Sequence, residues 1–286
     1  MYRYILALLF LTSTLWGVEI TGIGSKVKDV FNSSSHPFNY DLHIDLIQGA
    51  TPNEDFIICC HGYAGNYSIA SIIHSYKVTS KHLLGFNFPD HDLFERKYAP
   101  GQVTFGSIEE LLPIFYILKK VVVDAKVDKV SLYGFSAGGG AVVNAVAILN
   151  SQRYDQDLQR VGVDASAKAK ILEALQKGSI LLDAPLKSMD EVKDLHKGDP
   201  IMAILIPRYR ENQMRPIDAL ANWAGLKLNV IVFFQNPDTS LTNRDDKLFI
   251  QRLQQYNPDG KTVALIRDEG GHLGFHHSLW NAFQGL

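Results

Sequence analysis

The chain contains 286 residues, of which 28 are Lys or Arg, 30 are Asp or Glu, and 46% are hydrophobic. This length and composition are typical of a globular protein with a substantial core, and they exclude a disordered, collagen-like or coiled-coil chain. A net charge of -2, with no stretch dense in Lys and Arg, argues against a protein that binds nucleic acid by neutralising phosphates.

The first element in chain order is an apolar N-terminal segment. Arg3 precedes an apolar run over residues 4–11, and no acidic residue occurs before Glu19. This arrangement is typical of a secretory signal peptide, and the run is shorter than the ~20 residues that span a bilayer. We therefore expect residues 1–17 to be removed on export to the periplasm or the cell exterior. A membrane anchor, which would bring the protein close to a membrane, and a buried N-terminal helix are the alternatives.

Strand and helix patterns alternate along the rest of the chain. Strand patterns cover residues 40–47, 56–60, 81–88, 129–133, 178–182, 228–234 and 261–266, and helical patterns cover 108–123, 138–149, 165–176, 245–256 and a last helix from about His276. The first strand alternates apolar and polar side chains like an edge strand, whereas the second is continuously apolar, which favours burial on both faces. The alternation predicts an α/β fold with a mostly parallel, doubly wound sheet and helices on both faces.

No linker, repeat or low-complexity tract divides this pattern, so we predict a single domain over residues 18–286. Residues 151–177 form its most polar segment, and we expect a helical insertion at the N-terminal edge of the sheet, away from the edge where such sheets bind ligands. Residues 185–224 leave room for only a small cap. Its apolar stretch 200–207 is expected to line a substrate pocket or to pack in the core.

The two cysteines, Cys59 and Cys60, are neighbours on a predicted strand. Successive strand side chains point to opposite faces, so a bond between them would be strained, and we interpret both as buried apolar residues. No spacing typical of a metal site, such as CxxC or HExxH, occurs in the chain. We expect neither a metal ion nor a cofactor.

The most informative motif is Gly134-Phe-Ser-Ala-Gly138, between a predicted strand and a predicted helix. In a nucleophile elbow a serine, here Ser136, occupies a strained turn, and the glycines on either side let neighbouring backbone approach closely. The strand-to-helix context supports this interpretation. A glycine-rich turn that only packs a helix on a sheet is the alternative.

A nucleophilic serine needs a base, a group that orients the base, and donors for the oxyanion. His272, in a glycine-containing turn after the last strand, is the best of the ten histidines for the base. Asp238, after the preceding strand, is the preferred acid, and Asp183, one strand earlier, is the alternative. The expected oxyanion donors are the amides of Ala137, directly after the serine, and of Tyr63, in the sequence His-Gly-Tyr-Ala-Gly at the end of an earlier strand.

With these motifs in this order, the chain resembles the α/β-hydrolase superfamily from about Asp41 to its C-terminus, and residues 181–191 resemble lid-poor serine hydrolases of the prolyl-oligopeptidase-like kind. The resemblance implies Ser136 as nucleophile, His272 as base, Asp238 as acid, and Tyr63 and Ala137 as the oxyanion donors. The chain departs from the family pattern at 235–237, which lack the usual glycine of the acid turn, and at 87–92, where the family has a glycine-containing loop.

We therefore predict a serine hydrolase that cleaves a carboxylic ester or thioester of a small acyl substrate through an acyl-enzyme on Ser136. Cleavage of peptide or amide bonds by the same residues is one alternative. A non-catalytic binding protein on a hydrolase fold is another, because fold does not determine function. The presence of Ser, Asp and His together argues against the binding protein, since an unused site has no physical need for all three.

Overall fold

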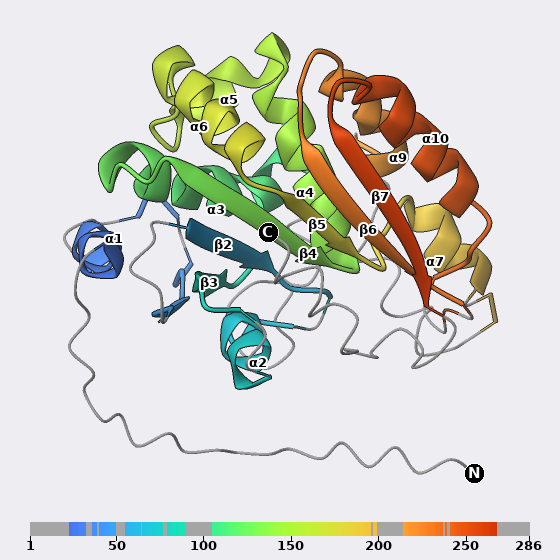
Figure 1. Ribbon diagram of the computed structural model, residues 1–286, viewed down its shortest axis with the longest axis horizontal. Helices are drawn as coiled ribbons and strands as arrows, with labels where there is room; N and C mark the ends of the chain where they lie inside the picture. The colour runs from blue at the N-terminus through green and yellow to red at the C-terminus, as the bar shows by residue number, and fades with distance from the viewer. Residues whose placement is uncertain are drawn as a thin grey trace.

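The computed structural model describes residues 23–32, 36–38, 40–49, 55–63, 65–76, 79–89, 105–195, 197–198, 214–236, 238 and 241–267. A seven-stranded sheet with the order β1-β3-β2-β4-β5-β6-β7 forms its centre (Figure 1). The strands are β1 (Ile44–Ile47), β2 (Asp55–Cys60), β3 (His82–Phe86), β4 (Lys129–Phe135), β5 (Ile180–Asp183), β6 (Asn229–Gln235) and β7 (Lys261–Arg267). Only the pairing of β1 with β3 is antiparallel, so the predicted mostly parallel α/β sheet is confirmed.

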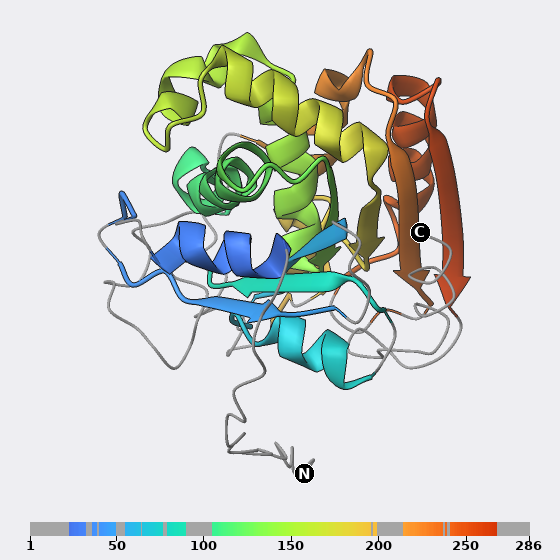
Figure 2. The same ribbon diagram turned by 60° about the vertical axis from the view of Figure 1, so that its left-hand side comes forward.

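Helices pack on both faces of this sheet. They are α1 (Ile23–Asn32), α2 (Ile69–Ser75), α3 (Ile108–Leu118), η1 (Lys119–Asp124), α4 (Ala137–Leu149), η2 (Gln152–Tyr154), α5 (Asp155–Gln159), α6 (Ala165–Lys177), α7 (Met189–Leu195), α9 (Pro216–Ala219), η4 (Leu220–Trp223) and α10 (Asp246–Tyr256). Figure 2 shows α2, in cyan, on one side of the strands and α1, α3, α4 and α6 on the other. The expected covering of both faces is confirmed.

The core consists of two layers, one on each face of the sheet. The larger layer includes Ile58 of β2 with Val146 of α4, and the smaller includes Ile57 of β2 with Ile73 of α2. Alternate residues of one strand therefore enter opposite layers, which explains why the central strands are continuously apolar. Cys60 joins the larger layer and Cys59 the smaller, both as buried free thiols, as predicted. Burial raises the pKa of both thiols, so they stay uncharged at neutral pH.

The predicted elements differ from the observed ones mainly at their ends. The edge strand begins at Ile44 rather than at residue 40, and the predicted helix over 108–123 is α3 followed by the π-helical turn η1. The N-terminal segment 1–17, the apolar stretch 200–207 and the last predicted helix lie outside the described residues. Among the helices that the structure describes, none has the length and apolar character needed to cross a membrane.

Candidate active site

The carboxyl ends of β2, β4, β5 and β6 meet at one edge of the sheet because these strands are parallel neighbours (Figure 1). The register pairs Cys60 at the end of β2 with Gly134, and it pairs Phe135 at the end of β4 with Asp183. The segments that follow these strands therefore start side by side. Ligands of open α/β sheets bind at this edge.

Ser136 occupies the sharp turn from β4 into α4. Its φ is 53° and its ψ is -118°, a conformation that costs a non-glycine residue energy. The Ser136 N–H donates to the carbonyl of Asp183 at 2.9 Å, and the Ser136 carbonyl accepts from the N–H groups of Gly139 and Leu186, each at 2.9 Å. Backbone contacts on both sides thus hold the strained turn, which has the geometry of a nucleophile elbow.

Two close contacts fix the surroundings of this turn. A Cβ atom on Gly138 would lie 2.3 Å from the carbonyl oxygen of Cys60, so the first turn of α4 lies directly against the end of β2. A Cβ atom on Gly62 would lie 3.2 Å from Cβ of Ser136, so the segment after β2 reaches the serine. The sequence predicts a close backbone approach at the glycine two residues after the serine, and this prediction is confirmed at Gly138.

The residues expected to donate to an oxyanion lie beside this contact. Ala137 is the first residue of α4, and the amides of a first helical turn have no acceptor within the helix. Tyr63 follows Gly62 in a turn that is closed by the Gly65 N–H, which donates to the Gly62 carbonyl at 3.0 Å. Tyr63 also packs against the apolar cluster that contains Ala137. The structure therefore brings Ser136, Ala137 and Tyr63 together, and their roles as donors remain a prediction.

His61, which sequence reasoning treated only as part of the turn, holds two loops together. Its Nε2 accepts the N–H of Phe88 at 3.1 Å, so the proton of the neutral ring lies on Nδ1, which donates to the Gly62 carbonyl at 2.7 Å. The ring is buried and meets Phe88 edge to face. His61 thereby fixes the Tyr63 turn to the end of β3, a contact that depends on the adjacency of β2 and β3.

The two candidate acids lie at the carboxyl ends of neighbouring strands. Asp183 ends β5, is 1% exposed, and accepts a hydrogen bond from the Tyr133 hydroxyl at 3.0 Å. Asp238 follows β6, is half-buried, and accepts the N–H of Leu241 at 2.8 Å. His272 lies outside the described residues, so its place relative to Ser136 and to either carboxylate remains a prediction.

A small apolar cluster borders the Ser136 turn. Its buried members are Phe105, Ala137, Leu186, Met189 and Leu241, with Tyr63 and Val192 packed against it. Leu186 and Met189 lie in the segment 181–191, which resembles serine hydrolases, but nothing in the sequence of that segment or of the segment after β6 indicates that they pack beside Ser136. The cluster makes this part of the site apolar.

Sequence reasoning also missed a buried group of charges beside the site. The Nζ atom of Lys187 lies 3.0 Å from Oε1 of Glu191 and 2.7 Å from Oδ1 of Asp246. The side chains of Lys187 and Glu191 are 3% and 0% exposed. Burial raises the pKa of Glu191 to about 7, and the nearby Lys187 ammonium opposes this rise without cancelling it. The i, i+4 spacing of Lys187 and Glu191 was the only signal in the sequence, and it is typical of exposed helices.

Glu191→Gln is expected to flatten the pH dependence of stability. The pKa of Glu191 rises from 4.5 to about 7 in the folded protein, so this group favours the fold below pH 4.5 and the contribution is lost as the pH rises through 7. The wild type should lose about 2.5 kcal/mol of unfolding free energy from this group between pH 5 and pH 8, and the variant should not. Urea unfolding at both pH values measures the difference.

The matched control is Glu173→Gln. Glu173 also pairs with a lysine at i, i+4, Lys177, at 2.7 Å, but it is exposed. This control should keep the pH dependence of the wild type. An equal loss of stability with pH in the wild type and in Glu191→Gln would contradict the prediction.

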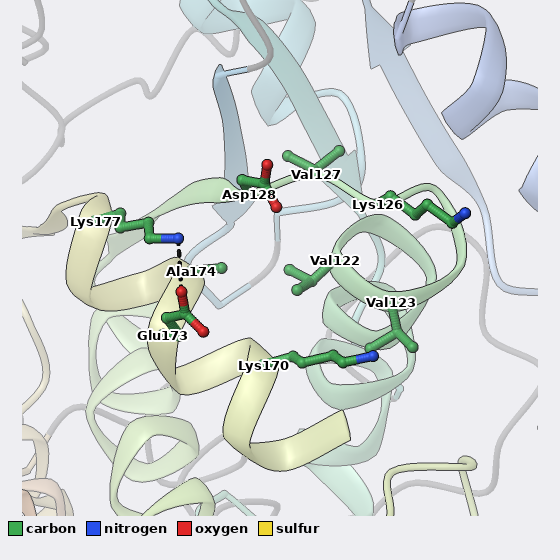
Figure 3. Close-up of a pocket in the computed structure, with 9 residues that line it drawn as sticks. All are labelled: Val122, Val123, Lys126, Val127, Asp128, Lys170, Glu173, Ala174 and Lys177. Atoms are coloured by element: carbon green, nitrogen blue, oxygen red, sulfur yellow. Dashed lines mark hydrogen bonds and ion pairs between the residues drawn. The ribbon is translucent and has the colours of Figure 1, made fainter. Parts of the chain in front are cut away.

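A separate pocket of about 370 Å³ lies between η1 and α6 (Figure 3). Val122, Val123, Val127 and Ala174 form its apolar part, and the charged side chains around it include the ion pair of Glu173 with Lys177. Its lining residues 126–128 directly precede β4, so the pocket is at the opposite end of that strand from Ser136. In the part of the chain that the structure describes, no group of three or more His, Cys, Asp or Glu side chains is arranged to hold a metal ion.

Several solved esterase structures resemble the chain over most of its length. A carboxylesterase from Lactobacillus plantarum has a TM-score of 0.55 at 13% identity and covers 81% of this chain and 79% of its own. Est1E from Butyrivibrio proteoclasticus, solved with ferulic acid bound, has a TM-score of 0.54 at 14% identity, covering 85% and 93%. An esterase from Pyrococcus furiosus has a TM-score of 0.53 at 14% identity, covering 90% of each chain.

No protein-family model and no curated protein sequence matches the chain. At these low identities, the structural likeness establishes a shared fold. The activity has to be argued from the residues at the carboxyl edge of the sheet.

Proposed function

We propose that this chain, which has the α/β-hydrolase fold, is a serine esterase that cleaves a carboxylic ester or thioester of a small acyl substrate. The observation that carries the proposal is the strained turn at Ser136, held between β4 and α4 by hydrogen bonds to Asp183, Gly139 and Leu186. A strained residue that its surroundings hold in place is typical of a functional site. A turn that only packs a helix on a sheet does not require a serine with a positive φ.

In the proposed reaction, Oγ of Ser136 attacks the acyl carbon while His272 accepts the hydroxyl proton and Asp238 orients the imidazole. The N–H groups of Ala137 and Tyr63 stabilise the oxyanion of the tetrahedral intermediate. The protonated His272 then gives its proton to the leaving alcohol or thiol. Water, deprotonated by the same histidine, attacks the acyl-enzyme and releases the carboxylic acid.

The preference for an ester over an amide rests on two supports. The solved structures of the same fold reported above are described as esterases or carboxylesterases. The apolar cluster of Phe105, Ala137, Leu186, Met189 and Leu241 beside the Ser136 turn provides surroundings suited to an acyl chain. Amide cleavage by the same residues is the competing activity, and the substrate test below separates the two.

A fluorophosphonate probe tests the nucleophile. We expect stoichiometric labelling of the folded wild type, its loss in Ser136→Ala, and its retention in the control Ser151→Ala, which alters a serine just beyond the other end of α4. Absence of labelling in the folded wild type would contradict a catalytic role. Labelling that persists in Ser136→Ala would place the nucleophile elsewhere.

A panel of p-nitrophenyl esters of graded acyl length, with an acyl thioester and a peptide anilide, tests the bond that is cleaved. We expect turnover of the esters and thioester, and none of the anilide, by the protein that the probe labels. Anilide turnover that exceeds ester turnover would favour a peptidase or amidase. Labelling without turnover of any substrate would leave a reactive serine whose substrate is of another class and would contradict the esterase assignment.

A further inference from the structure

We propose that Lys187 is a positioning residue that fixes the loop carrying Asp238 to the Ser136 turn. The proposal rests on the proposed function, because it takes Asp238 as the acid. It extends that function by assigning a role to a buried lysine that acts through other residues. Three sets of contacts connect the serine to the aspartate.

The first step is the attachment of Lys187 to the serine turn. The N–H of the preceding residue, Leu186, donates to the Ser136 carbonyl at 2.9 Å. The N–H of Lys187 donates to Oε2 of Glu191 at 3.2 Å, and its carbonyl accepts the N–H of Ile217 at 3.0 Å. The backbone of Lys187 is therefore fixed relative to Ser136 before its side chain is considered.

The second step is the reach of the Lys187 side chain to the next loop. Its Nζ atom lies 2.7 Å from Oδ1 of Asp246, the first residue of α10, and 5.3 Å from the ring centroid of Phe234 in β6. Phe234 precedes Asp238 in the chain and Asp246 follows it. One ammonium group thus contacts both ends of the segment that carries the proposed acid.

The third step is a pair of hydrogen bonds that joins the two ends of that segment. Asn243 Nδ2 donates to Oδ2 of Asp246 at 2.8 Å and to the carbonyl of Gln235, the last residue of β6, at 2.7 Å. The segment from Gln235 to Asp246 is therefore held at both ends. Within it, Asp238 is held by the N–H of Leu241.

The charge of Lys187 fits a positioning role better than a contribution to stability. The groups that face or adjoin it are Glu191 on α7, Asp246 and Asp245 at the start of α10, and the Phe234 ring of β6, with exposed Arg244 paired to Asp245. A buried ion pair is commonly no more stable than an apolar group of similar volume. It does require one arrangement of its partners, and here the partners belong to the loops after β5 and β6.

Kinetics of Lys187→Met and Asn243→Ala test the proposal, with active sites counted by the fluorophosphonate probe. We expect kcat per labelled site to fall about 10- to 100-fold in Lys187→Met, and less in Asn243→Ala, with little change in KM, because a displaced carboxylate orients the base poorly. The acid limb of the kcat/KM profile should move to lower pH in both variants. A carboxylate near the imidazole raises the pKa of that ring, and displacement removes this effect.

Two controls separate positioning from general loss of stability. Lys168→Met removes a partly buried lysine that lies 2.6 Å from Asp155, and Asn229→Ala removes a side-chain bond to the Gly178 carbonyl at the opposite end of β6. Both controls should keep kcat per labelled site and the acid limb of the wild type. Because Asn243 is exposed, its alanine variant decides the question if Lys187→Met does not fold.

Suppose that Asn243→Ala and any folded Lys187→Met keep the kcat per labelled site and the acid limb of the wild type. This result would overturn the inference and leave the proposed esterase function standing. Absence of labelling or turnover in the wild type would overturn the proposed function and this inference together. The two failures therefore give different results.

Discussion

Asp238→Asn is expected to lower kcat for ester hydrolysis by about 10⁴-fold, on the scale seen when the acid of a catalytic triad is neutralised. Asparagine keeps the size of the side chain, and its carbonyl oxygen still accepts the Leu241 N–H, so the turn after β6 should persist. The variant loses the charge that, in the proposed triad, holds the imidazole in the correct tautomer and stabilises the imidazolium. Initial rates with a p-nitrophenyl ester measure kcat, and thermal unfolding confirms that the variant is folded.

The same measurements on Asp183→Asn test the alternative acid. Asp183 is buried and accepts the Tyr133 hydroxyl at 3.0 Å, so we expect its replacement to lower stability more than kcat. Tyr133→Phe is the matched control, because it removes the donor and keeps the carboxylate. If Asp183→Asn loses about 10⁴-fold in kcat while Asp238→Asn keeps its activity, the acid is Asp183.

The distinction between these two acids shows where the sequence stops being sufficient. Asp183 ends β5 and Asp238 follows the end of β6, so local patterns place both at the carboxyl edge of the sheet. Their environments differ because Tyr133 lies on the strand next to β5, which is a consequence of strand order. Strand order depends on crossovers between distant segments, so no short stretch of sequence determines it.

The elements that the sequence predicts well are those set by local sterics and periodicity. The strands of the sheet and the start of α4 follow from apolar runs and from the spacing of Gly134, Ser136 and Gly138. The turn at Ser136 is predicted because its positive φ follows from a few consecutive residues. The hydrogen bonds to Asp183 and Leu186 that hold it come from distant segments and were not predicted. The π-helical turn η1 is missed, since its residues continue the apolar spacing of α3.

The buried charges illustrate the opposite case. Lys187 and Glu191 have the spacing of a solvated helical pair, and Asp246 has the position of an ordinary residue at a helix start. Their burial depends on α10 packing beside the segment after β5, a tertiary contact. The similar pair Glu173 and Lys177, with the same spacing, is exposed. Spacing alone therefore cannot separate a positioning cluster from a surface ion pair.

Gly138→Ala is expected to destabilise the fold by about 3 kcal/mol, although alanine is the better helix former by about 1 kcal/mol. The added Cβ would lie 2.3 Å from the Cys60 carbonyl oxygen and 2.4 Å from that of His61. Both are backbone atoms, and Cys60 is paired with Gly134 in the centre of the sheet, so neither yields without disturbing the pairing of β2 with β4. Urea unfolding at pH 7 measures the loss.

The control for this prediction is Gly162→Ala. Gly162 has a φ of 76°, and the nearest atom to an added Cβ is the Lys119 Cε at 3.6 Å, so the cost there is backbone strain of about 1–2 kcal/mol without a clash. Gly138→Ala should be less stable than Gly162→Ala. A Gly138→Ala variant that is as stable as the wild type, or more stable, would contradict the packing argument.

Folded Gly138→Ala should also react slowly with the fluorophosphonate probe, because relief of the clash moves α4 away from β2. That movement separates the amide of Ala137 from the Tyr63 turn, which weakens the proposed oxyanion hole.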